Sequence, residues 1–174
     1  MKKLRKFFSV VLCLALIFSL QGFAFAKPGS TEQTDSSVAK VNGLYYDTLS
    51  EAINAVEEEG TVELVADAVL DEKIIIKTGK NITLDLGTYI IKSDGGLFDG
   101  NSMLFENNGN FTITGNGSID ATDGANPYIC IENKRDSQLN VLSGNIIASK
   151  NGIRNIGGTL NILGGTIANT STAA

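Results

Sequence analysis

From residue 61 onward, apolar and polar residues alternate with a period of two, and Gly or Asn stands at almost every break. Side chains alternate between the two faces of a β-strand, so this pattern predicts a series of short strands. Residues 48–59 differ, because their apolar residues recur at the spacing of a helix. These residues are Leu49, Ala52, Ile53 and Val56. Thr48 and Glu51 form a capping box before them and Gly60 follows, so we expect one helix over residues 48–59 and strands from residue 61.

The alternating segments also repeat at long range. An apolar pair recurs as Ile82/Leu84, Phe111/Ile113, Leu139/Val141 and Leu160/Ile162. An apolar residue, followed two positions later by a small polar one, precedes each pair as Ile76/Thr78, Phe105/Asn107, Ile131/Asn133 and Ile153/Asn155. The turn after each pair leads to Tyr89, Ile119, Ile146 and Ile167. The copies start 29, 26 and 22 residues apart, and a spacing near 22 residues is typical of one turn of a compact parallel β-helix.

Three all-β architectures would accommodate such strands: an antiparallel β-sandwich, a small barrel and a parallel coil. A sandwich would use Asn108-Gly109, Asn116-Gly117 and Asn151-Gly152 as hairpin turns. It does not explain why whole segments recur, whereas stacked coils require equivalent positions to face the same neighbours. We therefore expect a right-handed parallel β-helix of about four to five coils, with an antiparallel β-sandwich as the alternative.

Three asparagines recur at one corner of the expected coil, at Asn107, Asn133 and Asn155. Stacked at equal positions, their side-chain amides would hydrogen-bond along the coil axis and satisfy backbone groups of the turns. Asn is also frequent in turns because it tolerates left-handed backbone angles. The shared register of the three asparagines favours the ladder over this explanation.

Residues 1–26 have the pattern of a secretory signal peptide, with a basic start, an apolar run and the cleavage sequence Ala24-Phe25-Ala26. The apolar run is shorter than the roughly 20 residues that a membrane-spanning helix requires. Residues 27–39 are small and polar, which predicts a flexible tether without fixed structure. We therefore expect a secreted or cell-surface protein whose β-helix domain occupies residues 40–174.

Removal of the leader would take away four of the 14 basic residues and none of the 19 acidic ones, so that the net charge moves from −5 to −9. A chain this acidic is not expected to bind nucleic acid or an anionic membrane surface. Cys130 would be the only cysteine left, which excludes an internal disulfide. Its neighbours Ile129 and Ile131 predict a buried thiol rather than a reactive one.

Three segments, YDTLSEAI at residues 46–53, GTVEL at residues 60–64 and NITLDLG at residues 81–87, resemble the start of the secreted and cell-surface pectate-lyase-like β-helix proteins of Gram-positive bacteria. The resemblance covers roughly residues 40–170. It implies a β-helix whose N-terminal end is closed by a short amphipathic helix, which would be residues 48–59. It implies no single activity, because this fold carries lyases, hydrolases, adhesins and proteins without known activity.

The hydrolases of that family carry clustered aspartates, a Gly-His-Gly and an Arg-x-Lys on successive strands, and this chain contains no histidine. A calcium-dependent lyase needs carboxylates that hold the metal and an unprotonated Arg or Lys as base. Arg154 shares its position in the repeat with Glu106 and Glu132, and this column holds the candidate catalytic residues. An outward salt bridge between Glu132 and Arg154 is the simpler interpretation.

Aspartates in glycine-rich loops are the candidate metal ligands, namely Asp94, Asp99, Asp120 and Asp123. Asp is frequent in such turns without metal, and neither loop matches a complete calcium-binding loop. We therefore expect no cofactor, with Ca²⁺ as the metal that these loops would suit.

The expected function is that of a non-catalytic exported scaffold or surface protein that contacts polysaccharide along its flat outer faces. The alternative is a pectate-lyase-like polysaccharide lyase or hydrolase, or the N-terminal fragment of one. No helical or charged segment follows the last copy in residues 168–174, so the last coil would expose strand edges. The sequence predicts that the chain is an incomplete part of a longer protein or that it associates end to end.

Overall fold

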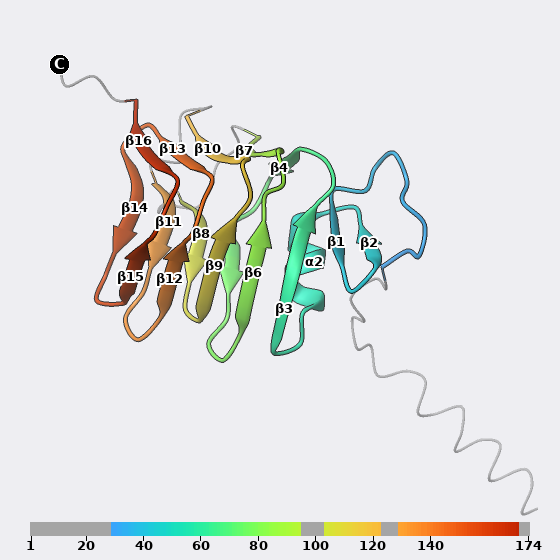
Figure 1. The fold of residues 1–174 in the computed structure, drawn as a ribbon, viewed down its shortest axis with the longest axis horizontal. Helices are drawn as coiled ribbons and strands as arrows, with labels where there is room; N and C mark the ends of the chain where they lie inside the picture. Colours follow the sequence, from blue (N-terminus) through green and yellow to red (C-terminus); the bar gives the residue numbers. More distant parts are fainter. Residues whose placement is uncertain (1–28, 95–102, 123–128, 171–174) are drawn as a thin grey trace, which may run out of the picture.

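The alternating segments form three sheets that wind around a common core (Figure 1). The computed structural model describes residues 29–94, 103–122 and 129–170. The first sheet contains β1 (Ala39–Val41), β2 (Leu44–Tyr46), β3 (Glu59–Leu64), β6 (Asn81–Asp85), β9 (Asn110–Thr114), β12 (Gln138–Val141) and β15 (Thr159–Ile162). The second contains β4 (Ala68–Leu70), β7 (Ile90–Ser93), β10 (Ser118–Ala121), β13 (Asn145–Ala148) and β16 (Thr166–Asn169). The third contains β5 (Ile74–Ile76), β8 (Met103–Asn107), β11 (Ile129–Asn133) and β14 (Asn151–Asn155).

The chain visits the three sheets in a fixed order, so that β3, β4 and β5 form one coil and β6, β7 and β8 stack on it. Successive coils pair in parallel, as between β6 and β9 and between β11 and β14. The predicted parallel β-helix is confirmed as a β-solenoid, and the antiparallel sandwich is wrong. Among the described residues, antiparallel pairing is confined to β1 with β2 and β3 and to a bridge between Ser30 and Tyr45.

The repeated apolar pairs lie in the predicted register. Partners along the first sheet are Ile82, Phe111, Leu139 and Leu160 in one row and Leu84, Ile113, Val141 and Ile162 in the next. Two assignments in the first copy are wrong, because Ile91 rather than Tyr89 belongs to the row of Ile119, and Ile74 rather than Ile76 pairs with Phe105. Both errors are shifts of two residues. Such a shift keeps the same face of the strand inward, so the alternation could not exclude it.

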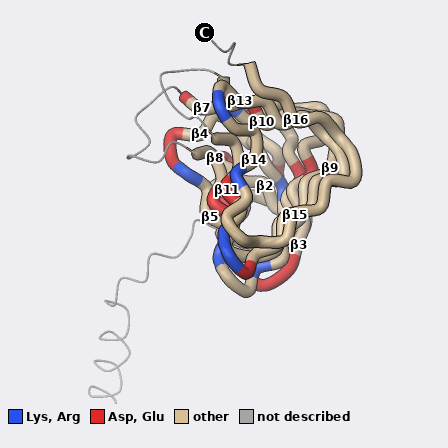
Figure 2. Tube along the Cα trace, turned by 90° about the vertical axis from the view of Figure 1, so that its left-hand side faces the viewer, with Lys and Arg blue, Asp and Glu red and all other residues tan. Residues whose placement is uncertain are grey.

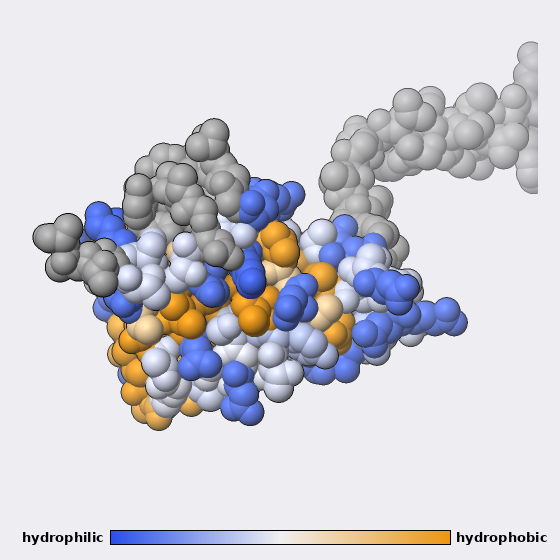
Figure 3. All heavy atoms as spheres, turned by 90° about the horizontal axis from the view of Figure 1, so that it is seen from above, coloured by the Kyte–Doolittle hydropathy of each residue, from blue (hydrophilic) through white to orange (hydrophobic). Residues whose placement is uncertain are grey.

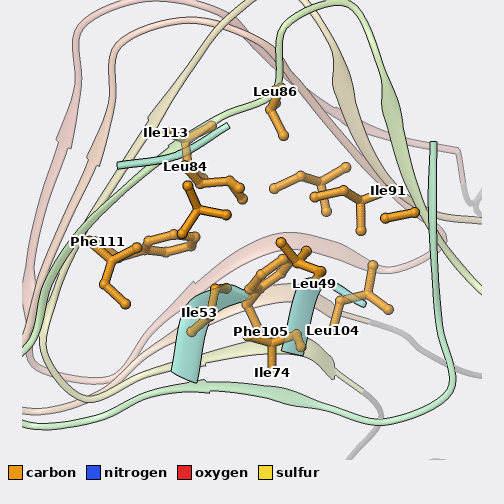
Figure 4. Close-up of a cluster of buried hydrophobic side chains, with 14 of the residues drawn as sticks. Leu49, Ile53, Ile74, Leu84, Leu86, Ile91, Leu104, Phe105, Phe111 and Ile113 are labelled. Atoms are coloured by element: carbon orange, nitrogen blue, oxygen red, sulfur yellow. The ribbon is translucent and has the colours of Figure 1, made fainter. Parts of the chain in front are cut away.

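Inward side chains of the three sheets form one apolar core (Figure 4). Leu84 and Phe111 from the first sheet lie across this core from Ile91 of the second and Phe105 of the third. The rings of Phe105 and Phe111 stack with their centroids 5.5 Å apart. Burial of a side chain of this size stabilises the fold by roughly 1.5–3 kcal/mol, so the core supplies most of the favourable free energy.

The helix α2 (Leu49–Ala55) is shorter than the predicted residues 48–59. Thr48 is its N-cap as predicted, and the Thr48 hydroxyl accepts from the backbone amide of Glu51 at 3.1 Å. Gly60 does not end the helix, because it lies inside β3. In β3, Glu59 has Asn81 as its parallel strand partner. In a longer helix, the glutamates at residues 57–59 would lie at the negative end of the helix dipole and would destabilise that helix.

The buried side of α2 consists of Leu49, Ala52 and Ile53, which belong to the apolar core (Figure 4). Figure 1 places α2 at the end of the solenoid where β3 begins. That the helix closes this end of the coil stays a prediction.

The segment before β1 is more ordered than the predicted tether of residues 27–39. The leader predicted at residues 1–26 and the first two residues of the tether lie outside the described residues. Ser30 and Tyr45 exchange backbone hydrogen bonds of 2.8 and 2.7 Å, and Ser37 is buried. The prediction of no fixed structure is therefore wrong for residues 30–39. Strand β2 has a second edge that offers backbone partners, and polar composition does not reveal such an edge.

The Asn-Gly pair at residues 108–109 forms a corner of the coil rather than a hairpin, because it connects β8 to β9 in different sheets. A Cβ atom at Gly109 would lie 2.5 Å from the carbonyl oxygen of Lys77 and 2.7 Å from that of Lys80. No side chain fits at those separations, so the close stacking of this corner on the preceding coil requires glycine.

Candidate functional site

The three corner asparagines form a hydrogen-bonded ladder along one corner of the solenoid, buried at Asn107 and Asn133 and exposed at Asn155. Asn107 Nδ2 donates to Asn133 Oδ1 at 2.7 Å, and Asn133 Nδ2 donates to Asn155 Oδ1 at 2.9 Å. Asn107 Nδ2 also donates to the Gln138 carbonyl at 2.8 Å, and Asn133 Nδ2 to the Thr159 carbonyl at 3.0 Å. The predicted stacking along the axis is confirmed, and it satisfies backbone groups of the next coil.

Burial makes this ladder a structural element rather than a binding site. Asn107 and Asn133 are fully buried. The Gly109 amide donates to Asn107 Oδ1 at 3.1 Å, and Ser137 Oγ donates to Asn133 Oδ1 at 2.7 Å. The hydrogen-bonding groups of both side chains are thus used within the protein. The ladder begins at Asn107, because Ile76 occupies the same row in the preceding coil.

The predicted column of Glu106, Glu132 and Arg154 is present, since these residues are partners on β8, β11 and β14. Lys73 Nζ donates to Glu106 Oε2 at 2.7 Å, and Asn108 Nδ2 donates to Glu106 Oε1 at 3.1 Å. The hydrogen bond from Lys73 is the main reason that the pKa of Glu106 is lower than its ordinary value, and partial burial opposes it. Glu106 is therefore a paired carboxylate.

Glu132 is buried, which differs from the expected outward salt bridge. Only 1% of Glu132 is exposed, and its carboxylate forms ion pairs with Lys134 and Arg154. The salt bridge predicted between Glu132 and Arg154 exists, but it has a buried anion and a second cation. A buried carboxylate is costly unless it is paired, so both cations compensate the loss of its hydration.

The contacts in this column do not support Arg154 as the base of a lyase. A base must accept a proton, and the guanidinium of arginine stays protonated in proteins unless its site is unusual. Here Arg154 Nη2 pairs with the Glu132 carboxylate, so the guanidinium is engaged within the protein. The charged groups of this column pair with one another and with neighbouring lysines.

Of the four candidate calcium ligands, Asp94 and Asp120 lie in the part of the chain that the structure describes. Asp99 and Asp123 lie outside that part. Asp120 Oδ1 accepts from the Thr122 amide at 2.9 Å and from the Thr122 hydroxyl at 2.6 Å, as in a local turn. Asp94 follows β7, where its amide donates to the Leu70 carbonyl at 3.0 Å. Within residues 29–94, 103–122 and 129–170, no three His, Cys, Asp or Glu side chains are grouped to hold a metal ion.

Cys130 is a free, fully buried thiol, as its apolar neighbours predict. Its Sγ donates to the Ile147 carbonyl at 2.9 Å. Burial raises the pKa of Cys130 to about 12, so the thiol stays protonated at physiological pH. Cys130 is therefore part of the core.

A second set of polar rows covers the outer side of the first sheet. Two adjacent rows of outward residues carry only hydroxyl and amide groups from β6 to β15, and we call them the amide–hydroxyl face. Its members are Asn81, Thr83, Asn110, Thr112, Gln138, Asn140, Thr159 and Asn161. All eight are half-buried or exposed. Figure 2 shows that the tube of β15 is uncharged, whereas charged positions gather beside β5 and β11.

Hydrogen bonds connect the amide–hydroxyl face along the solenoid axis. Asn161 Nδ2 donates to Asn140 Oδ1 at 2.8 Å, and Asn140 Nδ2 donates to Thr112 Oγ1 at 3.2 Å. A side-chain amide has two N–H donors, and each of these contacts uses one. The row is thus held in place while it retains hydrogen-bonding capacity toward the solvent side.

Polysaccharide contact was predicted on the outer faces without named residues, and this row was not predicted. The signal was the residue between the two apolar members of each repeated pair, which is Thr83, Thr112, Asn140 or Asn161. A single Thr or Asn on a strand suggests no chemistry. The register of the coils is what assembles four of them into one surface.

Comparisons of the chain with protein-family models, curated proteins and solved structures give no significant match. Among the described residues, no helix combines the length and the apolar character that crossing a membrane requires.

Proposed function

We propose that the protein is a non-catalytic, exported β-solenoid that binds an uncharged, extended polysaccharide along the amide–hydroxyl face. The row of Thr83, Thr112, Asn140 and Asn161 is the observation that carries this proposal. Hydroxyl and amide groups both donate and accept hydrogen bonds, as the hydroxyl groups of sugars do, so the two surfaces are chemically complementary. Export is proposed from the leader pattern of residues 1–26.

The spacing of the row supports a polymer that lies along the solenoid axis. Neighbouring strands of a sheet are about 4.8 Å apart, so the row presents one polar side chain at each such interval. One sugar unit of an extended polysaccharide has a similar length. Successive sugars would therefore meet equivalent side chains, and several weak contacts would add to a useful affinity.

The charge of the protein favours an uncharged polymer over an acidic one. Without its leader the chain has a net charge of −9, which repels polyanions. None of the eight residues of the amide–hydroxyl face is ionisable. Charged residues border the face without belonging to it: Glu59 is the β3 partner of Asn81, Asp85 lies two positions after Thr83 on β6, and Lys40 pairs with Glu63 at 2.8 Å between β1 and β3.

The alternative of a polysaccharide lyase has less support. Its candidate base Arg154 is paired with Glu132, and its candidate acidic ligands Asp94 and Asp120 take part in no group that would hold calcium within the described residues. Its substrates would be polyuronates, which have the same sign of charge as the protein.

The proposal is tested by affinity electrophoresis of residues 27–174 in gels that contain hydroxyethyl cellulose. The wild-type chain should be retarded. The double substitution Asn140→Ala and Asn161→Ala should weaken binding about tenfold, because it removes hydrogen bonds worth roughly 0.5–1.5 kcal/mol each. A matched control is Asn54→Ala with Asn116→Ala, two exposed asparagines outside the face, and it should bind like the wild type.

Retardation that persists in the Asn140/Asn161 variant would contradict the assignment of the face. A lack of retardation in the wild type, together with ultraviolet absorbance from polygalacturonate and Ca²⁺, would replace the proposal with the lyase alternative.

A further inference from the structure

A hollow of about 190 Å³ lies between the segment before β1, strand β2 and the start of α2. Because one water molecule occupies about 30 Å³ in the liquid, this space has room for about six waters, or for one sugar unit. Figure 3 shows mainly hydrophilic residues at the right end of the coloured atoms, where Figure 1 places β1 and β2. The hollow therefore suits a small polar ligand.

Specific contacts hold the segment before β1 in place as one wall of the hollow. Ser36 Oγ donates to Asp47 Oδ1 at 2.9 Å, and the Val38 amide donates to the Tyr46 carbonyl at 2.9 Å. A Cβ atom at Gly29 would lie 2.7 Å from Cζ of Tyr46, so the close approach of this segment to the ring requires glycine. The shape of the hollow is thus determined by contacts on both of its sides.

Among the described residues that line the hollow, two carry carboxylates and none is basic. Both carboxylates, of Asp47 and Glu51, belong to half-buried residues. Lys40 is the strand partner of Tyr45, but its ammonium group pairs with Glu63 at 2.8 Å. Partial burial removes some of the hydration of a carboxylate, and a bound cation compensates for that loss. The hollow therefore favours a ligand with a positive charge.

The other side chains that line the hollow are aromatic or carry hydroxyl groups. Tyr45 is half-buried there, and the face of an aromatic ring attracts an ammonium group. Ser30, Thr34 and Ser36 supply hydroxyl groups that both donate and accept hydrogen bonds. A simple alkylamine would use only the carboxylates and the ring. A sugar with an ammonium group would use the hydroxyl groups as well.

We propose that this hollow binds one amino-sugar unit, which is a sugar with a primary ammonium group in place of one hydroxyl. The carboxylates of Asp47 and Glu51 accept charge-assisted hydrogen bonds from the ammonium group, and the sugar ring packs against Tyr45. Hydroxyl groups of the sugar pair with Ser30 and Thr34. An N-acetylated sugar lacks the charge and is not a ligand of this site. The site is separate from the amide–hydroxyl face and does not depend on the function proposed for it.

Amide NMR spectra of residues 27–174, titrated at pH 6 with glucosamine, test the proposal. Glucosamine should shift the signals of Tyr45, Asp47 and Glu51. Glucose and N-acetylglucosamine should bind at least tenfold more weakly, because neither has an ammonium group. An absence of shifts with glucosamine would overturn the site. Equal binding of glucose would overturn the role of the carboxylates, and equal binding of propylamine would overturn the recognition of a sugar.

The substitution Glu51→Gln removes one of the two negative charges and should weaken glucosamine binding at least tenfold. Glutamine also suits this position of a capping box, so α2 should be retained, and circular dichroism verifies it. Glu57→Gln is the matched control, because Glu57 is exposed and does not line the hollow, and it should bind like the wild type. Equal affinities of the two variants would overturn the assignment.

The double variant Asn140→Ala with Asn161→Ala should bind glucosamine as the wild type does. The amino-sugar site and the polysaccharide face therefore fail or succeed in separate measurements. A loss of glucosamine binding in this double variant would place the amino sugar on the face and would overturn the assignment to the hollow.

Discussion

Two rows of asparagine run along the solenoid, and they differ mainly in what surrounds them. Asn107 and Asn133 are buried at a corner of the coil, and Asn155, the third member of their row, is exposed. Asn140 and Asn161 lie half-buried on the outer side of the first sheet. Both rows are connected by side-chain hydrogen bonds between coils, of 2.7 and 2.9 Å inside and 2.8 Å outside. The same residue type at the same spacing thus holds coils together in one place and forms a surface in the other.

The difference shows that burial, rather than residue type, determines what a repeated asparagine contributes. An amide that loses a buried partner cannot find water, so the cost of leaving it unpaired is high. An amide at the surface exchanges a protein partner for water at little cost. The inner row should therefore affect stability and the outer row should affect binding.

The largest effect is expected for Asn133→Ala. The substitution removes hydrogen bonds to Asn107, Asn155 and the Thr159 carbonyl. It should lower the free energy of unfolding by at least about 2 kcal/mol, because buried partners are left unsatisfied. Asn161→Ala is the matched variant on the outer row and should cost less than about 0.5 kcal/mol. Urea unfolding measures both, and equal effects would remove the distinction between the two rows.

A smaller loss of stability is expected in the charged column. Arg154→Ala leaves the buried carboxylate of Glu132 with Lys134 alone. Because Arg154 is itself 40% exposed, we expect a loss of about 1–2 kcal/mol, less than for a pair that is buried on both sides. Lys73→Ala breaks the more exposed pair with Glu106 and should cost less than about 1 kcal/mol. A larger loss for Lys73→Ala than for Arg154→Ala would contradict this order.

The rate at which the Cys130 thiol is alkylated measures how well each row of asparagines keeps the core closed to solvent. Its pKa of about 12 and its complete burial predict that iodoacetamide does not label the folded protein at pH 8. Cys130 and Asn133 share β11, so Asn133→Ala should speed labelling several-fold, while Asn161→Ala should leave the rate unchanged. Mass spectrometry of timed samples measures the rate. Rapid labelling of the wild type would show that β11 opens independently of the ladder.

The smallest effect is expected for the contribution of Glu106 to the pH dependence of folding stability. Its pKa is lower in the folded state, first because of the hydrogen bond from Lys73. The pairing therefore stabilises the fold above the ordinary glutamate pKa of about 4.3, and this contribution is lost as the pH falls through the lower folded value. The stability difference between wild type and Glu106→Gln should be under about 1 kcal/mol at pH 7 and should shrink below pH 4. Urea midpoints across this range measure it, with Glu58→Gln as an exposed control.

The repeat predicted the solenoid and the inner ladder because both depend on identical residues at identical positions. Phe111, Leu139 and Leu160 recur where packing demands an apolar side chain, and Asn133 recurs where a turn demands an amide. The copies differ in length at their corners. The predicted register of the first copy was therefore wrong by two residues at Tyr89 and Ile76. The two-residue period of a strand cannot reveal a shift of this size.

Other features depend on neighbours that a single sequence does not identify. The burial of Glu132 results from its position beside Lys134 and Arg154, and alternation predicts only that it points outward. The end of α2 before Gly60 results from the pairing of β3 with β6. A single Thr, Asn or Gln on a strand does not indicate a binding surface. The amide–hydroxyl face could therefore be recognised only from the register of the coils.

The buried ladder also gives the solenoid a direction. Asn107 and Asn133 each donate to a carbonyl about one turn of the solenoid later in the chain, whereas Asn155 Nδ2 donates to the Gly158 carbonyl, three residues later, at 2.9 Å. Each of these two buried amides thus donates a hydrogen bond to a part of the chain that follows it in the sequence. We expect the coils to fold in the order of their synthesis, because each coil can accept a hydrogen bond from an amide of the preceding part of the chain. Unfolding should begin at the last coil and proceed toward the first.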